Sequence, residues 1–266
     1  MFDPLKKMSV VVLCAAVVAG SGCGKKRAAV TCAGSTAFQS FAEKLAEEFM
    51  ANRNDISVTV QGGGSAVGIQ STLSGAAQIG MADLVNLPPE AKALTSIVVA
   101  RDGIAIIVNP ANPTANLTTE QLRGVFNGAI RNWKDVGGKD APITAVSREA
   151  GSGTRTSFEQ IVTGISLTKD AIIQDSNGTV RETVANDANA IGYLTHGVVN
   201  AKVKALTLEG QDCTVEAILA GKYKLVRPVF FLTKGPPDGA VKEFIDYVLS
   251  AEGQGIIKKN GLIPAK

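Results

Sequence analysis

The sequence predicts an α/β protein, because strand-like segments alternate with helix-like segments along most of the chain. In three places, at residues 29–52, 56–77 and 141–165, a strand pattern passes through glycine, serine or threonine straight into a helix pattern. A chain of 266 residues, 45% of them hydrophobic, can form one large domain or two lobes. A proline-rich break at residues 109–113 is the best candidate for a crossover between lobes, with a weaker return near 200–204.

Periodicity and turn residues predict the individual elements. In 37–52 the residues Phe38, Phe41, Leu45 and Phe49 recur at helical spacing, whereas 29–34 and 56–61 have the pattern of strands. The other helices are expected at 66–77, 117–138, 155–165, 215–223 and 239–261. The other strands are expected at 103–110, 141–148, 190–199 and 203–208. These segments alternate as an α/β architecture requires.

The first 23 residues have the pattern of a secretory signal. Lys6 and Lys7 precede an apolar run of about 13 residues, which is too short to span a membrane. Small residues then lead to Cys23, as in a bacterial lipobox, although Gly20 stands where leucine is usual. We expect a signal peptide at 1–23, a lipidated Cys23 and a polar tether at 24–29, with plain secretion as the alternative. Either places the protein in the periplasm or elsewhere outside the cytoplasm.

Charge and cysteine content narrow the function further. The net charge of +3 and the absence of a basic tract argue against binding to nucleic acid. Only Cys32 and Cys213 remain after the signal, without metal-ligand spacing. They form either a disulfide or two separately buried thiols, and the sequence leaves both open. We expect neither a metal nor a cofactor.

Three strand-to-helix turns are candidates for binding an anion. The start of a helix presents unpaired backbone N–H groups, glycine lets a ligand approach, and serine or threonine adds a hydroxyl donor. In the third turn, "SREAGSGTR" at 147–155, Arg148 precedes the small residues and offers a planar fork for two oxygens. Each turn alone is equally compatible with ordinary helix capping. Three together favour an anion site.

Asp83 follows an apolar strand-like run, which is an unusual place for a carboxylate. One interpretation is that it caps the next turn. The other is that it accepts a hydrogen bond from an oxyanion that still carries a proton. Phosphate is protonated near pH 7 and sulfate is not, so such an aspartate would admit the first and reject the second.

Several segments in this order resemble the PstS family, the substrate-binding components of bacterial phosphate ABC transporters. They are "AGSTAF", "QGGGSAVG", "IGMADLVNLP", "VFNGAIRNWKDVGG", "SREAGSGTRTSFE", "AIGYL" and "GKYKLVRPVFFLTK". The resemblance covers residues 30 to 265 and implies a type II periplasmic-binding-protein fold, with two lobes and a hinged ligand cleft. We assign 30–108 with 203–266 to lobe 1, and 109–202 to lobe 2.

The resemblance also implies a monomer that captures inorganic phosphate, delivers it to a membrane permease and is not an enzyme. Its phosphate-binding residues would be Ser35, Thr36, Ala37, Ser65, Asp83, Arg148, Ser152, Gly153 and Thr154. The alternatives are a binder of sulfate, molybdate or tungstate, and a secreted phosphate-responsive sensor or adhesin.

The chain departs from the family pattern at two places. Ala37 stands where an aromatic residue is frequent, and Ala150 stands where some members have an aspartate that pairs with the arginine. Glu149 is next to Arg148 instead, and whether the two pair is open. Arg155 fits the longer "GSGTR" form, and a side chain that only faces solvent is the alternative.

Other motifs have a structural interpretation. A hydrolase would use Ser65 or Ser152 with His196, the only histidine, but Val67 replaces the last glycine of a G-x-S-x-G elbow. Trp133 is expected to be a packing residue. The turn at 177–179 could begin another helix near the cleft, although such turns are common structural devices.

Overall fold

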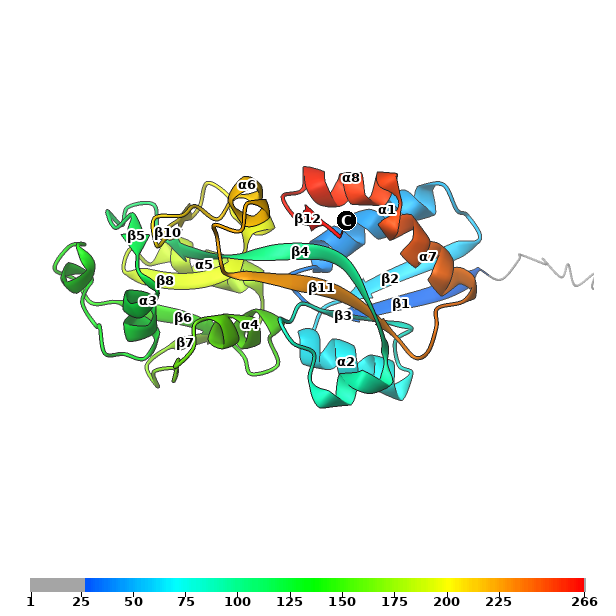
Figure 1. Cartoon of the computed structure of the whole chain (residues 1–266), viewed down its shortest axis with the longest axis horizontal. Coiled ribbons are helices and arrows are strands. Elements are labelled where there is room, and N and C mark those ends of the chain that lie inside the picture. Colours follow the sequence, from blue (N-terminus) through cyan, green and yellow to red (C-terminus); the bar gives the residue numbers. More distant parts are fainter. Residues whose placement is uncertain (1–26, 266) are drawn as a thin grey trace, which may run out of the picture.

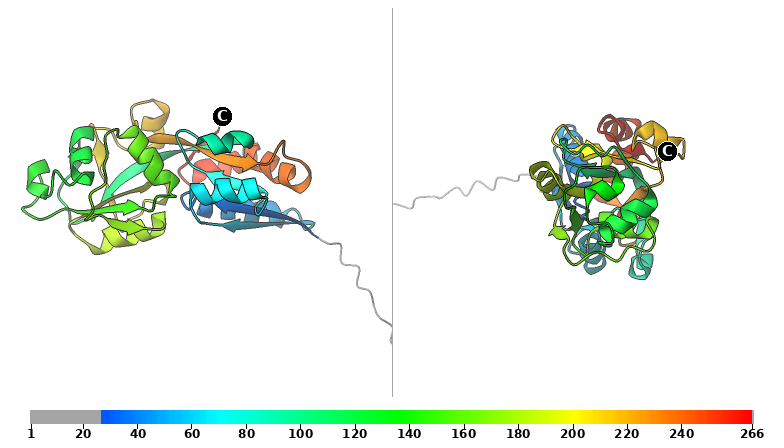
Figure 2. Two further views of the ribbon diagram at one scale, coloured as in Figure 1. Left: turned by 90° about the horizontal axis from the view of Figure 1, so that it is seen from below. Right: turned by 90° about the vertical axis from the view of Figure 1, so that its left-hand side faces the viewer.

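The computed structural model describes residues 27–265 and shows two lobes lying end to end along the longest axis, also when seen from below (Figures 1 and 2). One lobe contains β1 (Ala28–Gly34), α1 (Gln39–Ala51), β2 (Ile56–Gln61), α2 (Ser65–Ser74), β3 (Ile79–Ala82), α7 (Gly239–Leu249), α8 (Ala251–Lys259) and β12 (Ile263–Pro264). The other contains β5 (Asn116–Leu117), α3 (Thr119–Phe126), β6 (Thr144–Arg148), α4 (Gly153–Ile161), β7 (Ile172–Gln174), α5 (Asn177–Asn186), β8 (Ala190–Thr195), β9 (Lys204–Ala205), β10 (Thr207–Leu208) and α6 (Val215–Leu219). We call them lobe 1 and lobe 2.

Two long strands, β4 (Thr95–Val108) and β11 (Val226–Thr233), join the lobes (Figure 1). The strand order of the main sheet is β2-β1-β3-β11-β4-β8-β6-β7. The first part of β4 pairs with β11, from Thr95 opposite Thr233 to Gly103 opposite Val226. Its last five residues, from Ile104 to Val108, pair with β8 of lobe 2. A single strand therefore belongs to both lobes, as expected for a connection about which two lobes can rotate.

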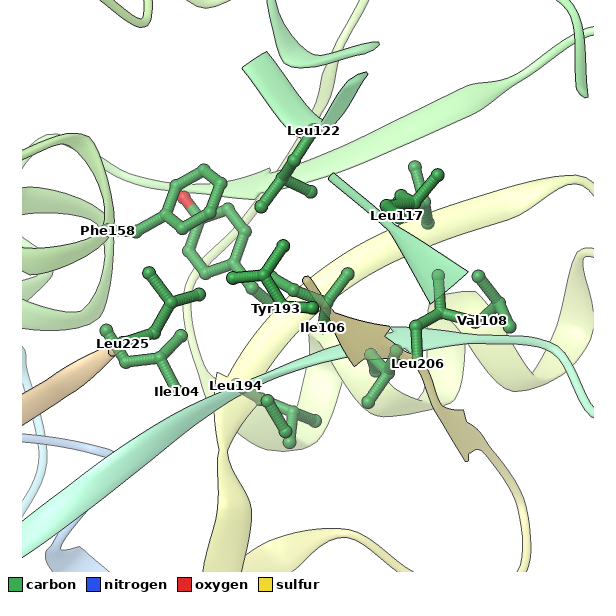
Figure 3. Close-up of a cluster of buried hydrophobic side chains, with 14 of the residues drawn as sticks. Ile104, Ile106, Val108, Leu117, Leu122, Phe158, Tyr193, Leu194, Leu206 and Leu225 are labelled. Carbon is green, nitrogen blue, oxygen red and sulfur yellow. The ribbon is translucent and has the colours of Figure 1, made fainter. Parts of the chain in front are cut away.

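Each lobe has its own hydrophobic core. In lobe 1 the apolar face of α1 is buried, and Phe38, Phe41, Leu45 and Phe49 confirm the predicted helical spacing. The core of lobe 2 is drawn in Figure 3, where Phe158 lies against Tyr193 with ring centroids 4.2 Å apart. The α/β layering predicted from the sequence is confirmed.

The packing of residues 203–225 differs from the lobe boundaries that we predicted from the sequence. Val203, Leu206, Cys213 and Leu225 pack in the core of lobe 2, although residues 203–225 were expected in lobe 1. The chain break at 109–113 lies beyond the far end of β4, within lobe 2. We therefore propose that both crossings run through β4 and β11, because these strands carry the chain from one core to the other.

Several predicted elements differ in extent. The helix expected at 117–138 ends at Phe126, because Gly128 adopts a left-handed conformation with φ of 74°. The helix expected at 239–261 is divided at Ser250, whose backbone is extended and whose hydroxyl accepts from the N–H of Gly253 at 3.2 Å. Strand β4 begins at Thr95, well before the predicted residue 103.

The two cysteines are free and buried, Cys32 in the core of lobe 1 and Cys213 in that of lobe 2. Of the two alternatives, separately buried thiols are therefore the one formed. Burial raises the pKa of Cys32 to about 12.

The predicted signal peptide and Cys23 lie outside the described residues. Strand β1 begins at Ala28, so the last two residues of the expected tether, 28 and 29, are in a strand. Within residues 27–265, every helix is too short or too polar to cross a membrane.

Candidate anion-binding site

The three predicted turns meet between the lobes. The turn after β1 and the turn after β2 belong to lobe 1, and the turn after β6 belongs to lobe 2. Contacts across the gap are short: the N–H of Ala66 donates to the carbonyl of Gly151 at 3.2 Å. Arg148 Nη2 donates to Thr36 Oγ1 at 3.1 Å. The sequence therefore identified turns that the fold brings together.

In the turn after β1, the free backbone donors are the N–H groups of Thr36 and Ala37. The N–H of Ser35 donates to the carbonyl of Met81 at 2.9 Å, and its hydroxyl accepts from the N–H of Phe38 at 3.1 Å. Within residues 27–265, no hydrogen bond uses the backbone N–H of Thr36 or Ala37. Ala37 needs no aromatic side chain for this, because a backbone donor is independent of the side chain.

The turn after β2 holds Asp83 in place. Ser65 Oγ donates to Asp83 Oδ1 at 2.6 Å and accepts from the N–H of Asp83 at 3.1 Å. Gly64 has φ of 89°, and a Cβ there would lie 2.8 Å from the carbonyl oxygen of Gly151 in lobe 2. Glycine is thus required both by the conformation and by the close approach of the lobes.

The turn after β6 begins α4 and presents its first N–H groups to the gap. Ser152 is the N-cap, its hydroxyl accepting from the N–H of Arg155 at 3.3 Å. Gly153 and Thr154 are the first two residues of the helix, so their N–H groups have no partner within it. A Cβ on Gly153 would lie 2.1 Å from Ser65 Oγ. Glycine therefore lets the helix start reach lobe 1.

Arg148, at the end of β6, is buried and retains one free donor. Glu149 accepts from Nε and Nη2 at 2.9 Å each, so the pairing left open by the sequence is present. The carbonyls of Gln174 and Asp175 accept from the same two nitrogens. Nη1 is buried without a partner among the described residues. A buried guanidinium donor without an acceptor is costly, so this atom is a candidate contact for an anion.

Asp83 lies at the end of β3 and has an arginine partner that the sequence did not identify. Arg227 Nη1 is 2.5 Å from Asp83 Oδ2, and Thr154 Oγ1 donates to the same oxygen at 3.4 Å. Asp83 is therefore not a simple turn cap, since its carboxylate lies among side chains of both lobes.

Arg227 on β11 also binds a second buried acid, Asp102 on β4. Its Nε and Nη2 donate to Asp102 Oδ2 at 3.0 and 2.7 Å. The hydroxyl of Thr195, from β8, also donates to Asp102. Burial raises the pKa of Asp102, although Arg227 and Thr195 favour its ionised form. The signal that could have found this cluster is a charged residue inside each of two apolar strands.

The remaining candidates have structural contacts. Arg155 does not simply face solvent, because its Nη1 donates to the carbonyl of Arg148 at 3.0 Å and its Nε to Glu159 at 2.8 Å. The ring of His196 lies 3.4 Å from the carbonyl of Gly261, and no described hydrogen bond joins it to Ser65 or Ser152. Within residues 27–265 no cluster of acidic, histidine or cysteine side chains could hold a metal ion.

A cavity of about 430 Å³ opens beside two of the three turns, those after β2 and β6. Lobe 1 lines it with Ser65, Ala66 and Leu84, among others, and lobe 2 with Gly151, Gly153 and Thr156, among others. Ser65 and Gly153 belong both to this cavity and to the turns. The cavity therefore adjoins the turns after β2 and β6.

Comparisons with known proteins agree with this arrangement. A family model described as a PBP superfamily domain matches residues 19–252. The phosphate-binding protein PstS of Bacillus subtilis is 36% identical over 245 residues, which are 90% of this chain and 82% of that protein.

Two solved structures resemble the chain over nearly its whole length. One is a phosphate ABC transporter substrate-binding protein from Clostridium perfringens with bound phosphate, at 38% identity and a TM-score of 0.87 over 90% of this chain and 100% of that one. The other is an ABC-type phosphate transport receptor from Vibrio cholerae, at 37% identity and a TM-score of 0.74 over 88% and 99%.

Proposed function

Because the chain belongs to the PstS family of phosphate-binding proteins, we propose that it binds inorganic phosphate between its lobes and delivers it to an ABC transporter permease. The observation that carries the proposal is the unpartnered Nη1 of buried Arg148, at the point where three turns meet. The same relatives are solute-binding proteins, and we propose that this chain likewise catalyses no reaction.

The binding residues are proposed from the free donors around that point. Arg148 supplies the positive charge, and the backbone N–H groups of Thr36, Ala37, Gly153 and Thr154 surround the anion. Ser152 adds a hydroxyl, whose oxygen accepts from the N–H of Arg155 and whose proton has no acceptor among the described residues. Ser65 donates its hydroxyl to Asp83 and so contributes by holding that carboxylate in the site. The N–H of Ser35 is bonded to the carbonyl of Met81, but its hydroxyl only accepts, from the N–H of Phe38, so its proton can be donated to the anion as that of Ser152 can. Fixed donors of this kind replace the water shell of phosphate without reorganising when it binds.

Asp83 is proposed as the acceptor for the proton of bound phosphate. Its two oxygens are held by Ser65 and Arg227, so the carboxylate cannot turn away from an anion that offers no proton. Sulfate would then place a bare oxygen against a fixed acceptor, and it would bind less tightly than phosphate.

Binding is proposed to involve rotation of the lobes about β4 and β11. Phosphate would enter while the turns are apart, and the contacts between Thr36 and Arg148 and between Ala66 and Gly151 would form as they close. We propose that the protein acts outside the cytoplasm, held to a membrane by a lipid on Cys23.

Isothermal titration tests this function. The purified protein is unfolded and refolded to remove carried ligand, then titrated with phosphate, sulfate and molybdate at pH 7. We expect phosphate to bind tightly and the other two weakly. Binding of only sulfate or molybdate would retain the anion site and reject the role of Asp83. A folded protein that binds none of them would favour a sensing or adhesive role.

A further inference from the structure

Asn177 is the first residue of α5 in lobe 2, and its side chain is buried, with 3% of its surface exposed. Its Oδ1 accepts a hydrogen bond from the backbone N–H of Thr195 at 3.0 Å. This bond fixes which end of the amide is oxygen, because a backbone N–H can only donate. The other end, Nδ2, is buried and has no partner among residues 27–265.

A buried amide nitrogen without an acceptor is unfavourable, so it calls for an explanation. Arg148 Nη1 is in the same condition, and the contacts of these two residues converge. Arg148 Nη2 donates to the carbonyl of Asp175, two residues before Asn177, at 3.0 Å. That nitrogen also donates to Thr36 Oγ1 at 3.1 Å. Thr36 and Asn177 line one cleft between the lobes.

The opposite side of Asn177 leads to the acidic part of the site. Thr195, whose N–H binds the Asn177 amide, donates its hydroxyl to Asp102. Thr195 also lines a small gap together with Ala37, Asp83 and Asp102. Asn177 thus shares a cleft with Thr36, the partner of Arg148, and is joined through Thr195 to Asp102 beside Asp83.

We infer that Asn177 is a further phosphate-binding residue, whose Nδ2 donates a hydrogen bond to a phosphate oxygen. The inference rests on the proposed function. It means that lobe 2 contributes donors from two helix starts, those of α4 and α5. An amide donor is neutral, so Asn177 would increase affinity for any tetrahedral oxyanion. The distinction between protonated phosphate and unprotonated sulfate would still depend on Asp83.

Two substitutions at this position separate direct binding from a structural role. Asn177→Asp keeps the oxygen that accepts from Thr195 but replaces the free NH₂ by a second oxygen. Asn177→Ala removes both. If Nδ2 contacts phosphate, the aspartate variant faces the anion with a negative charge and binds more weakly than the alanine variant. We expect Kd for phosphate to rise about tenfold for Asn177→Ala and about a hundredfold for Asn177→Asp.

A merely structural asparagine would give the opposite order, because Asn177→Asp preserves the bond to Thr195 and Asn177→Ala loses it. That order, or unchanged affinity in both variants, would overturn the inference. Urea unfolding of each variant without phosphate shows whether an affinity change comes from loss of folding. Binding is then compared only at urea-free conditions where both are folded.

Asn112→Ala is the matched control. Asn112 is also buried, with 4% exposed, and its Oδ1 likewise accepts from a backbone N–H, that of Thr114, at 3.0 Å. It lies in the loop after β4, far from the three turns, and this variant should bind phosphate like the parent. If the parent itself did not bind phosphate, the proposed function would fail, and this inference with it.

Discussion

Two buried arginines, Arg148 and Arg227, differ in their contacts, and we propose that the first binds the anion whereas the second stabilises the fold. Both are only 1% exposed. Arg227 lies on β11 between two buried carboxylates, those of Asp83 and Asp102. Arg148 lies at the end of β6 and pairs with Glu149, whose side chain is 31% exposed.

The two arginines differ in how many of their guanidinium nitrogens have a partner within the protein. All three guanidinium nitrogens of Arg227 contact acids of the fold. Arg148 retains Nη1 without a partner, and its one counter-ion is partly in water. A partly hydrated carboxylate neutralises a buried cation less completely than two buried ones do. Burial alone therefore does not distinguish a binding arginine from a structural one, whereas the count of unused donors does.

The largest effect is expected from Arg227→Met. Removing the guanidinium leaves two buried carboxylates without a cation, so the free energy of unfolding at pH 7 should fall by about 3–5 kcal/mol. Urea unfolding followed by circular dichroism measures it. Arg101→Met is the control, because Arg101 lies on the neighbouring strand β4 and is exposed. It should change the free energy by less than about 0.5 kcal/mol.

The pH dependence of Arg227→Met sharpens this prediction. Burial already raises the pKa of Asp102 in the parent, and removing Arg227 takes away an influence that lowers it. An acid with a raised pKa holds its proton more tightly in the folded state, so its stabilising effect grows as the pH falls. Lowering the pH from about 7 to about 5 should restore part of the lost free energy. A loss independent of pH would contradict the electrostatic explanation.

Arg148→Ala should have the next largest effect, on binding more than on folding. Hydrogen bonds to charged groups contribute about 1.5–3 kcal/mol each, so we expect Kd for phosphate to rise at least a hundredfold. Glu149 can turn into solvent when its partner is removed, so the variant should lose far less stability than Arg227→Met. Titration calorimetry measures the change in Kd, and urea unfolding measures the change in the free energy of unfolding. A variant that binds phosphate normally would assign Arg148 to structure as well.

Asp83→Asn is expected to have a smaller effect that concerns selectivity. The amide can donate to an oxyanion without a proton, so the ratio of sulfate to phosphate affinity should rise about tenfold. Ser152→Ala is the comparison, because it removes a hydroxyl of the proposed site without changing charge, and that hydroxyl bonds the N–H of Arg155 and not Asp83. It should weaken both anions alike. An unchanged ratio in Asp83→Asn would show that the proton is recognised elsewhere.

The sequence predicted the parts of the site that depend on local pattern. Glycine and hydroxyl residues between a strand and a helix identify a turn, and the fold brings those at Ser65 and Ser152 together. It did not predict that Arg227 reaches Asp83, because the two are 144 residues apart and meet only through the pairing of β11 with β3. The extents of β4 and of the divided C-terminal helix were missed for a related reason. In β4, strand pairing outweighs the local pattern. In the C-terminal helix, a single N-cap at Ser250 outweighs the helical periodicity.

The smallest effect is expected from Glu149→Gln, which tests whether Arg148 needs its counter-ion. Partly exposed ion pairs contribute about 0–1 kcal/mol, and glutamine can still accept from the guanidinium, so Kd for phosphate should change less than about threefold. Loss of the negative charge of Glu149 should, however, raise the positive electrostatic potential around Arg148. Phosphate association, measured by stopped flow, should then become faster at low salt than in the parent and approach it at high salt.

Glu159→Gln is the control for that measurement, because Glu159 is likewise half-buried, pairs with Arg155 at 2.8 Å, and has no bond to Arg148 among the described residues. It should leave the association rate nearly unchanged. A tenfold loss of affinity in Glu149→Gln would mean that the carboxylate is needed to orient Arg148. Arg148 and Arg227 would then both depend on their acidic partners, although the partner of Arg148 is more hydrated. The unpartnered Nη1 of Arg148 would be the one remaining difference that identifies it as the proposed binding residue.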